Sequence, residues 1–258
     1  MASAKLRAKV LLRSRSLEFT REYFKRQGDG TLRTYQWNGM PVTYRSGTSD
    51  ASLIYNILLK RAKSEYVLPP EAKLAPEDVK VVLDIGANIG VAALYFAATF
   101  PRATVHAFEP VPANCEVLRA NARAQPRIQA HCFALGAEDG EIELFDSDDE
   151  ANLGGFSSHG MGVNAARSQK VPVRHAGRAL AELGVTRADV IKIDTEGAEW
   201  EILTALDPAL LGVRVIMGEL HGRRDFELLD YLQPHFHIGA KKQLKTRLFN
   251  FFAVNRQV

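Results

Sequence analysis

Short apolar runs alternate with helical patterns along residues 81–258 of this 258-residue chain. We expect strands at 81–85, 104–109, 128–134, 190–194, 213–219, 235–240 and 247–254. We expect helices at 89–99, 112–124, 176–183, 197–206 and 223–232. This alternation is typical of a doubly wound, mostly parallel α/β sheet with crossover helices. The seventh run follows the sixth after too few residues for a parallel crossover, so we predict an antiparallel last strand.

The alternation breaks between the third and fourth strands, at residues 141–174. Two strand-like runs, 141–145 and 170–174, flank an acidic and glycine-rich tract, which predicts an inserted hairpin. Long loops in compact domains often bind ligands. We therefore predict that the loop at 152–162 lies over the substrate, with a disordered surface insertion as the alternative.

Residues 1–80 have too few apolar positions in clear periodicity for a second core. We predict that they form a cap of helix, hairpin and helix on the domain of residues 81–258, and not an independent domain. The Asn-Gly pair at 38–39 predicts the turn of the small hairpin. The Ser-Asp pair at 49–50 predicts a capped helix at 51–63.

Positive charge gathers at the N-terminal end of the chain. Residues 1–80 hold 15 Lys+Arg against 8 Asp+Glu, whereas residues 81–258 hold 18 against 22. The part that carries the candidate site is mildly acidic, which argues against a nucleic acid substrate. Residues 1–26 predict a basic amphipathic helix, which we expect to pack on the domain rather than to rest on a membrane.

Cysteine usage and hydropathy bear on the compartment. Cys115 and Cys132 fall on a predicted helix and a predicted strand without metal-type spacing, so we expect buried free thiols. No run reaches the eighteen or so apolar residues needed to span a bilayer, and no secretory pattern opens the chain. We expect a cytoplasmic protein.

A glycine turn at residues 84–90 follows the first predicted strand. Its pattern is D-x-G-x-N-x-G, with Asn88 and Val91 at the second and third glycine positions of a dinucleotide fingerprint. Asp84 also lies where its negative charge would repel a pyrophosphate. A cationic cofactor without phosphate suits the turn better, and the pattern is similar to the cofactor turn of S-adenosylmethionine-dependent methyltransferases. A turn with no ligand is the alternative.

Glu109 ends the second predicted strand, nineteen residues after Gly90. The second parallel strand lies beside the first, so its carboxyl end overlooks the same crevice. We predict that Glu109 binds the ribose hydroxyls of the cofactor. A solvated acid at a strand end is the alternative.

Charged residues gather after the fourth predicted strand, at 191–199. The sequence there, IKIDTEGAE, resembles the I-K-x-D-x-E-G-x-E signature of the FkbM-type methyltransferases. The likeness extends to residues 84–90, to Phe108-Glu109-Pro110, and to the stretch at 45–50. It covers about residues 43–254 and implies an O-methyltransferase that acts on a hydroxyl of a sugar, glycolipid or other specialised metabolite.

The resemblance also implies S-adenosyl-L-methionine as the cofactor, with S-adenosyl-L-homocysteine as its product. The residues expected to contact the cofactor are Asp84, Gly86, Asn88, Gly90, Glu109, Pro110, Asn114, Ala134, Leu135 and Asp194. Within this set Asp84 attracts cations, and the backbone at Ala134 and Leu135 meets adenine.

An alcohol nucleophile needs positioning and a base. The candidates are Asp194, Glu196 and His221; we favour His221, because a neutral imidazole near pH 7 suits the task. Asp194 or Glu196 would then orient the substrate or the base. A lone histidine at a strand end is also often structural. Acidic side chains could gather around Mg²⁺, but no spacing demands it, so we predict no metal.

Three alternatives to O-methylation stay open at this point. N-methylation of a small metabolite uses the same cofactor turn. A nucleotide-dependent oxidoreductase is disfavoured by Asn88, which stands where such enzymes need glycine. A cofactor-binding protein without catalysis is the third alternative.

Overall fold

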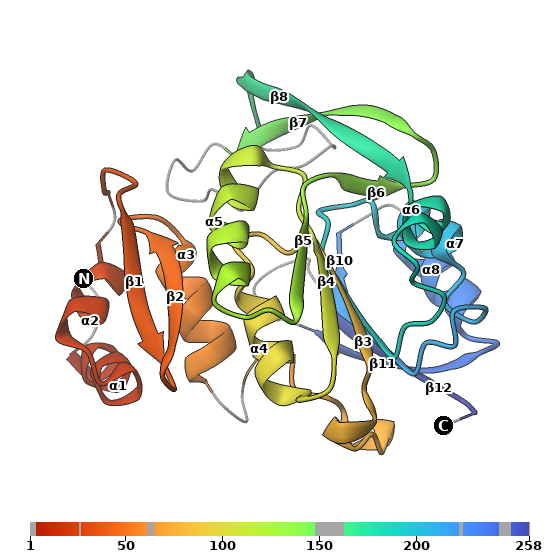
Figure 1. Cartoon of the computed structure of the whole chain (residues 1–258), viewed down its shortest axis with the longest axis horizontal. Coiled ribbons are helices and arrows are strands. Elements are labelled where there is room, and N and C mark those ends of the chain that lie inside the picture. Colours follow the sequence, from red (N-terminus) through yellow and green to blue (C-terminus); the bar gives the residue numbers. More distant parts are fainter. Residues whose placement is uncertain are drawn as a thin grey trace.

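A seven-stranded sheet forms the centre of the molecule (Figure 1). The computed structural model describes residues 4–25, 27–60, 64, 66–147, 163–221, 224–242 and 249–257. The strands of the sheet are β3 (Val81–Ile85), β4 (Thr104–Phe108), β5 (Ile128–His131), β9 (Val190–Ile193), β10 (Val215–Leu220), β11 (Phe236–Lys242) and β12 (Phe249–Asn255). Their order is β11-β12-β10-β9-β3-β4-β5. The pairs that β12 forms with β10 and β11 are antiparallel, and the other pairs in this sheet are parallel, which confirms the predicted class.

Helices cover both faces of this sheet (Figure 1). They are α4 (Val91–Thr99) and α5 (Pro112–Arg123) on one face, and α6 (Ala176–Glu182), α7 (Glu199–Leu206) and α8 (Asp225–Leu232) on the other. Side chains alternate between the faces along a strand. In β3, Val82 therefore packs with the α4 and α5 side, whereas Leu83 and Ile85 pack with the α6, α7 and α8 side. Burial on both faces explains the continuous apolar run of this strand.

The N-terminal elements pack against the α4 and α5 side (Figure 1). They are α1 (Ala4–Ser14), α2 (Leu17–Tyr23), β1 (Leu32–Trp37), β2 (Met40–Arg45), α3 (Asp50–Ile54), a π-helix (Tyr55–Leu59) and two 3-10 turns (Pro70–Ala72 and Pro76–Asp78). The predicted hairpin is confirmed, because β1 and β2 pair antiparallel around Asn38 and Gly39. Both turn residues have positive φ, 50° and 82°, as a two-residue turn with strand-matching twist requires.

Two details of the N-terminal part differ from prediction. The expected single helix at 1–26 is broken into α1 and α2, because Ser16 accepts a hydrogen bond from the Phe19 N–H and starts a new helix. Phe19 is 1% exposed, so this helix packs on the domain. Ser49 makes no side-chain cap for α3, and the carboxylate of Asp50 binds Arg45 instead.

The insertion forms a separate three-stranded sheet of β6 (Ala134–Gly136), β7 (Gly140–Ser147) and β8 (Val163–His175), in the order β6-β8-β7. Antiparallel pairing of β7 and β8 confirms the predicted hairpin. The strand expected at 128–134 is in fact two strands, β5 and β6, which belong to different sheets. The loop predicted over the substrate, 152–162, lies outside the described residues.

The expectation of free thiols is wrong. Cys115 on α5 and Cys132 just after β5 form a disulfide, with their Cα atoms 5.8 Å apart. The helix and the strand end lie side by side, which the linear spacing of the two cysteines does not reveal. A separate finding concerns membranes: among the described residues, no helix has the length and apolar character needed to cross a bilayer.

Candidate functional site

The glycine turn joins β3 to α4 at the carboxyl end of the sheet. Gly86 has φ 75°, and a Cβ added there would lie 1.9 Å from the carbonyl oxygen of Asp194. Glycine is therefore required, because the ends of β3 and β9 approach each other too closely for a side chain. Asn88 also has positive φ, 51°, which aims its backbone N–H at Glu109.

Lys192, which lies on β9, stabilises this turn. Its Nζ lies 3.3 Å from Oδ1 of the fully buried Asp84, and it donates hydrogen bonds to the carbonyl oxygens of Gly86 at 2.5 Å and Ile85 at 3.3 Å. Burial disfavours the ammonium, but the carboxylates of Asp84 and Asp194 outweigh that effect and raise the pKa of Lys192. The negative charge of Asp84 is thus paired with the positive charge of Lys192 inside the protein.

Glu109 lies at the end of β4 and is 4% exposed. Its Oε2 accepts from the Asn88 N–H at 2.8 Å, and its Oε1 accepts from the Val111 N–H at 3.0 Å and from Asn114 Nδ2 at 3.4 Å. A carboxylate has about four acceptor positions, so these bonds leave one free, on Oε2. Glu109 can accept from one further hydroxyl.

A cavity opens beside these residues. Of the predicted cofactor residues, those that line it are Gly86, Asn88, Glu109, Pro110, Asn114, Ala134, Leu135 and Asp194. Asp84 and Gly90 lie outside its lining, where they shape the turn. Phe108 and Phe133 add apolar wall near Ala134 and Leu135.

The N-terminal part also reaches the cavity. Leu53, Ile57 and Tyr66 form part of its wall, and the ring centroid of Tyr66 lies 5.8 Å from Lys192 Nζ. This shared wall supports the prediction that residues 1–80 are not independent. Leu53 and Ile57 lie on the helix predicted at 51–63, but the sequence does not show that they reach the cavity, because that depends on how the cap docks.

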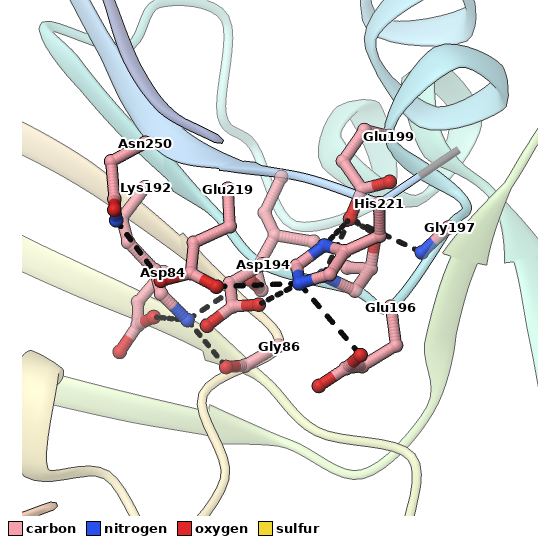
Figure 2. A network of polar contacts seen from close by, with 12 residues as sticks. Asp84, Gly86, Lys192, Asp194, Glu196, Gly197, Glu199, Glu219, His221 and Asn250 are labelled. Carbon is pink, nitrogen blue, oxygen red and sulfur yellow. Dashed lines mark hydrogen bonds and ion pairs between the residues drawn. The ribbon is translucent and has the colours of Figure 1, made fainter. Parts of the chain in front are cut away.

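Four carboxylates surround His221, which follows β10 (Figure 2). We call Asp194, Glu196, Glu199 and Glu219 the carboxylate cluster. The ring Nδ1 lies 3.3 Å from Glu199 Oε1, and Nε2 lies 3.3 Å from Glu219 Oε2. Asp194 and Glu196 lie 3.9 and 3.7 Å from the same Nε2. Both ring nitrogens therefore face carboxylate oxygens.

This setting contradicts the expectation of a neutral imidazole. Burial lowers the pKa of His221, but hydrogen bonds to Glu199 and Glu219 and the charges of Glu196 and Asp194 outweigh it and raise the pKa to about 11. His221 is then a cation at neutral pH, with a side chain only 8% exposed. It is also absent from the cavity lining. Its catalytic role stays a prediction, but not as the base that the sequence suggested.

Glu196 is the member of the carboxylate cluster with the properties of a base. It lines the cavity, and its side chain is 39% exposed. Burial raises its pKa, His221 lowers it, and the neighbouring carboxylates raise it again, to about 7. Its φ of 56° is rare for a residue with a side chain and is typical of functional turns. A carboxylate that titrates near neutrality can accept a proton at physiological pH.

The cluster also contains a grouping that suits a cation. Asp194, Glu219 and His221 each offer one ligand atom, and these atoms lie within 4.8 Å of one another. A metal would need the neutral imidazole. With a pKa of about 11, His221 holds a proton where that metal would bind.

The partner of Lys192 is not evident from the sequence. Among the described residues, its ion pair is with Asp84 on the adjacent strand β3. Parallel register places Asp84 directly opposite Lys192, a pairing that only the strand order reveals.

Fold and cavity place the chain among α/β proteins that hold a ligand at the carboxyl ends of a doubly wound sheet. Comparison with known proteins defines the group further. Residues 84–243 match the family model described as "Methyltransferase FkbM domain". The chain belongs to the FkbM methyltransferase family.

Three relatives show the range of this similarity. The chain is 33% identical over 237 residues to the AMB antimetabolite synthetase AmbE of Pseudomonas aeruginosa, across 73% of this chain and 11% of that protein. It is 30% identical to the hexuronic acid methyltransferase AglP of Haloferax volcanii, across 58% of this chain and 59% of that protein. It is 28% identical to the 31-O-demethyl-FK506 methyltransferase FkbM of Streptomyces tacrolimicus, across 58% and 67%. The chain thus spans a small part of the first relative and about 60% of the second.

Proposed function

We propose that this chain is an S-adenosyl-L-methionine-dependent O-methyltransferase acting on a hydroxyl of a sugar, glycolipid or specialised metabolite. The observation that carries the proposal is Glu196, a cavity-lining carboxylate with a pKa of about 7. It shares that cavity with Glu109, which keeps one acceptor position free. A base and a ribose acceptor in one cavity suit transfer to an alcohol.

The residues present fit this cofactor. Asn88 Oδ1 is buried and has no hydrogen-bond partner among the described residues, so it offers an acceptor to a cationic group such as an ammonium. Glu109 offers its free lone pair to a ribose hydroxyl, and Ala134 and Leu135 border an apolar end suited to adenine. When bound, the cofactor supplies a methyl group on a sulfonium.

Glu196 would accept the proton of the acceptor hydroxyl as that oxygen attacks. Positioning of the hydroxyl would come from Asp194, which lies beside Glu196 at the cavity edge. His221 would hold both carboxylates in place as an imidazolium, since its Nε2 faces both. The names of two relatives, a hexuronic acid methyltransferase and a 31-O-demethyl-FK506 methyltransferase, support a saccharide or specialised metabolite as the acceptor.

The direct test is methyl transfer from radiolabelled S-adenosyl-L-methionine to panels of hydroxylated and aminated acceptors of matched size. We expect label on hydroxylated sugars or metabolites and S-adenosyl-L-homocysteine as the second product. Label only on amines would replace this proposal with N-methylation.

Cofactor affinity provides a separate prediction. Glu109→Gln should weaken S-adenosyl-L-homocysteine binding, measured by calorimetry, by about 10- to 100-fold, because a charged acceptor for the ribose is lost. The matched control is Asp189→Asn. Asp189 is also a buried carboxylate that accepts two backbone N–H bonds, from Lys80 and Val81, but it lies at the other end of the sheet. Equal affinity of Glu109→Gln and the wild type would remove Glu109 from the cofactor site.

We also predict that activity needs no divalent cation. With a pKa of about 11, His221 is almost wholly protonated at pH 7, which lowers its apparent metal affinity by about 10⁴-fold. Protein treated with EDTA and then desalted should keep its turnover. Loss of turnover that Mg²⁺ restores would instead assign Asp194, Glu219 and His221 as metal ligands.

A further inference from the structure

A buried network of side-chain hydrogen bonds connects the N-terminal cap to Glu109. Arg45, the last residue of β2, forms two parallel bonds to Asp50, from Nε to Oδ2 at 2.8 Å and from Nη2 to Oδ1 at 2.9 Å. The same Nη2 donates to Asn114 Oδ1 at 2.9 Å, and Asn114 Nδ2 donates to Glu109 Oε1 at 3.4 Å. All four side chains belong to residues that are at most 6% exposed.

The hydrogen bonds from Arg45 through Asn114 to Glu109 can run in only one direction. A guanidinium has donors and no acceptor, so Arg45 must face the carbonyl oxygen of the Asn114 amide. The NH₂ group of Asn114 is thereby turned toward Glu109, which as a carboxylate only accepts. Arg45 and Glu109 select the same orientation of the amide. Without Arg45, only the longer bond to Glu109, at 3.4 Å, would still orient Asn114. Arg45 therefore fixes the position of the NH₂ group that Asn114 presents to Glu109.

Stability alone is a weak reason for this arrangement. Arg45 Nη1 is buried with no acceptor among the described residues, and a buried ion pair is often no more stabilising than apolar side chains of similar volume. The N-terminal part also lines the cavity through Leu53, Ile57 and Tyr66. The hydrogen-bond network that begins at Asp50 also ends at this cavity, because Glu109 lines it.

We propose that Arg45, held by Asp50, is a positioning residue that sets the Glu109 carboxylate for the cofactor ribose through Asn114. This inference rests on the proposed function. It makes the N-terminal cap part of the cofactor site without direct contact between Arg45 and the ligand, since Arg45 does not line the cavity. Cofactor affinity should then depend on a residue 64 positions before Glu109 in the sequence.

The test uses the full chain, with S-adenosyl-L-homocysteine as the calorimetric probe. Arg45→Met should raise its Kd about tenfold, the effect of one charge-assisted hydrogen bond, with a similar rise in KM for the cofactor and little change in kcat at saturation. Arg45→Lys keeps the charge beside Asp50 but loses the fork that also reaches Asn114, so it should fold and show an intermediate Kd. The control is Arg127→Met, which removes another packed arginine whose bonds go to backbone carbonyls far from Glu109. It should lower the melting temperature without changing Kd.

A double-mutant cycle separates positioning from general structure. In an Asn114→Ala background, Arg45→Met should add no further loss of affinity, because its route to Glu109 is already absent. An undiminished loss in that background, or Arg45 variants that bind like the wild type, would overturn the inference. Failure of the wild type to bind the probe would instead count against the proposed function.

Discussion

Glu196→Gln is expected to lower kcat by about 10²- to 10⁴-fold, the usual contribution of a general base. Glutamine has nearly the same shape but cannot take the proton of an acceptor hydroxyl. Cofactor affinity should change little, because Glu109 and the turn at 86–90 are untouched. Single-turnover methyl transfer at saturating cofactor measures the effect.

The pH profile makes this prediction specific. The pKa of Glu196 is raised from 4.5 to about 7, so the wild-type kcat/KM for the acceptor should rise as pH increases through about 7, where the base loses its proton. Glu196→Gln should lack that rising limb. The control is Glu138→Gln, which removes an exposed acid outside the cavity and should keep both rate and profile. A limb that persists in Glu196→Gln would move the base role to Asp194.

The fold was predictable because its strands have distinct local patterns. Residues 81–85 and 190–193 are mostly apolar runs, each with one charged residue, that are buried on both faces, and helices with clear starts separate such runs. The antiparallel last strand followed from connection length alone. The division of 128–134 into β5 and β6 was not predictable, because the strand-like run I-Q-A-H-C-F-A has no turn residue that shows where the chain changes sheets.

The candidate site was predictable where its residues lie at strand ends. Glu109 and Asp194 both follow strands that end at the same edge, and both line the cavity. Their partners depend on tertiary structure: Asp84 meets Lys192 because β3 lies beside β9, and Arg45 meets Asn114 because the cap docks on α5. No local pattern encodes such pairs.

The prediction that His221 is neutral was wrong because its neighbours also depend on tertiary structure. Sequence shows one histidine near one acid, Glu219, whereas the fold brings Glu199 from α7 and two further acids from the end of β9. The pKa of His221 depends on the combined effect of these four carboxylates, which only the folded site brings together. The raised pKa also predicts how His221 affects stability.

His221→Gln is expected to lower the free energy of unfolding by about 3 kcal/mol near pH 6.5, since it leaves the buried Glu199 and the partly buried Glu219 without their cation. The folded pKa of about 11 lies above the ordinary value of 6.5. The contribution of His221 is therefore fully present below pH 6.5 and is lost as pH rises through about 11. The deficit of the variant relative to the wild type should shrink steadily over that interval in urea unfolding experiments.

His106→Gln provides the matched comparison, because His106 is also a buried histidine, 5% exposed, but it bonds His131 and not a carboxylate. Burial lowers the pKa of His106 below its ordinary value of 6.5, so it is largely neutral in both the folded and the unfolded state from about pH 7.5 upward. Its deficit should stay constant from there to higher pH. A deficit of His221→Gln that is equally constant would show that His221 is neutral in the fold, and would return it to the set of candidate bases.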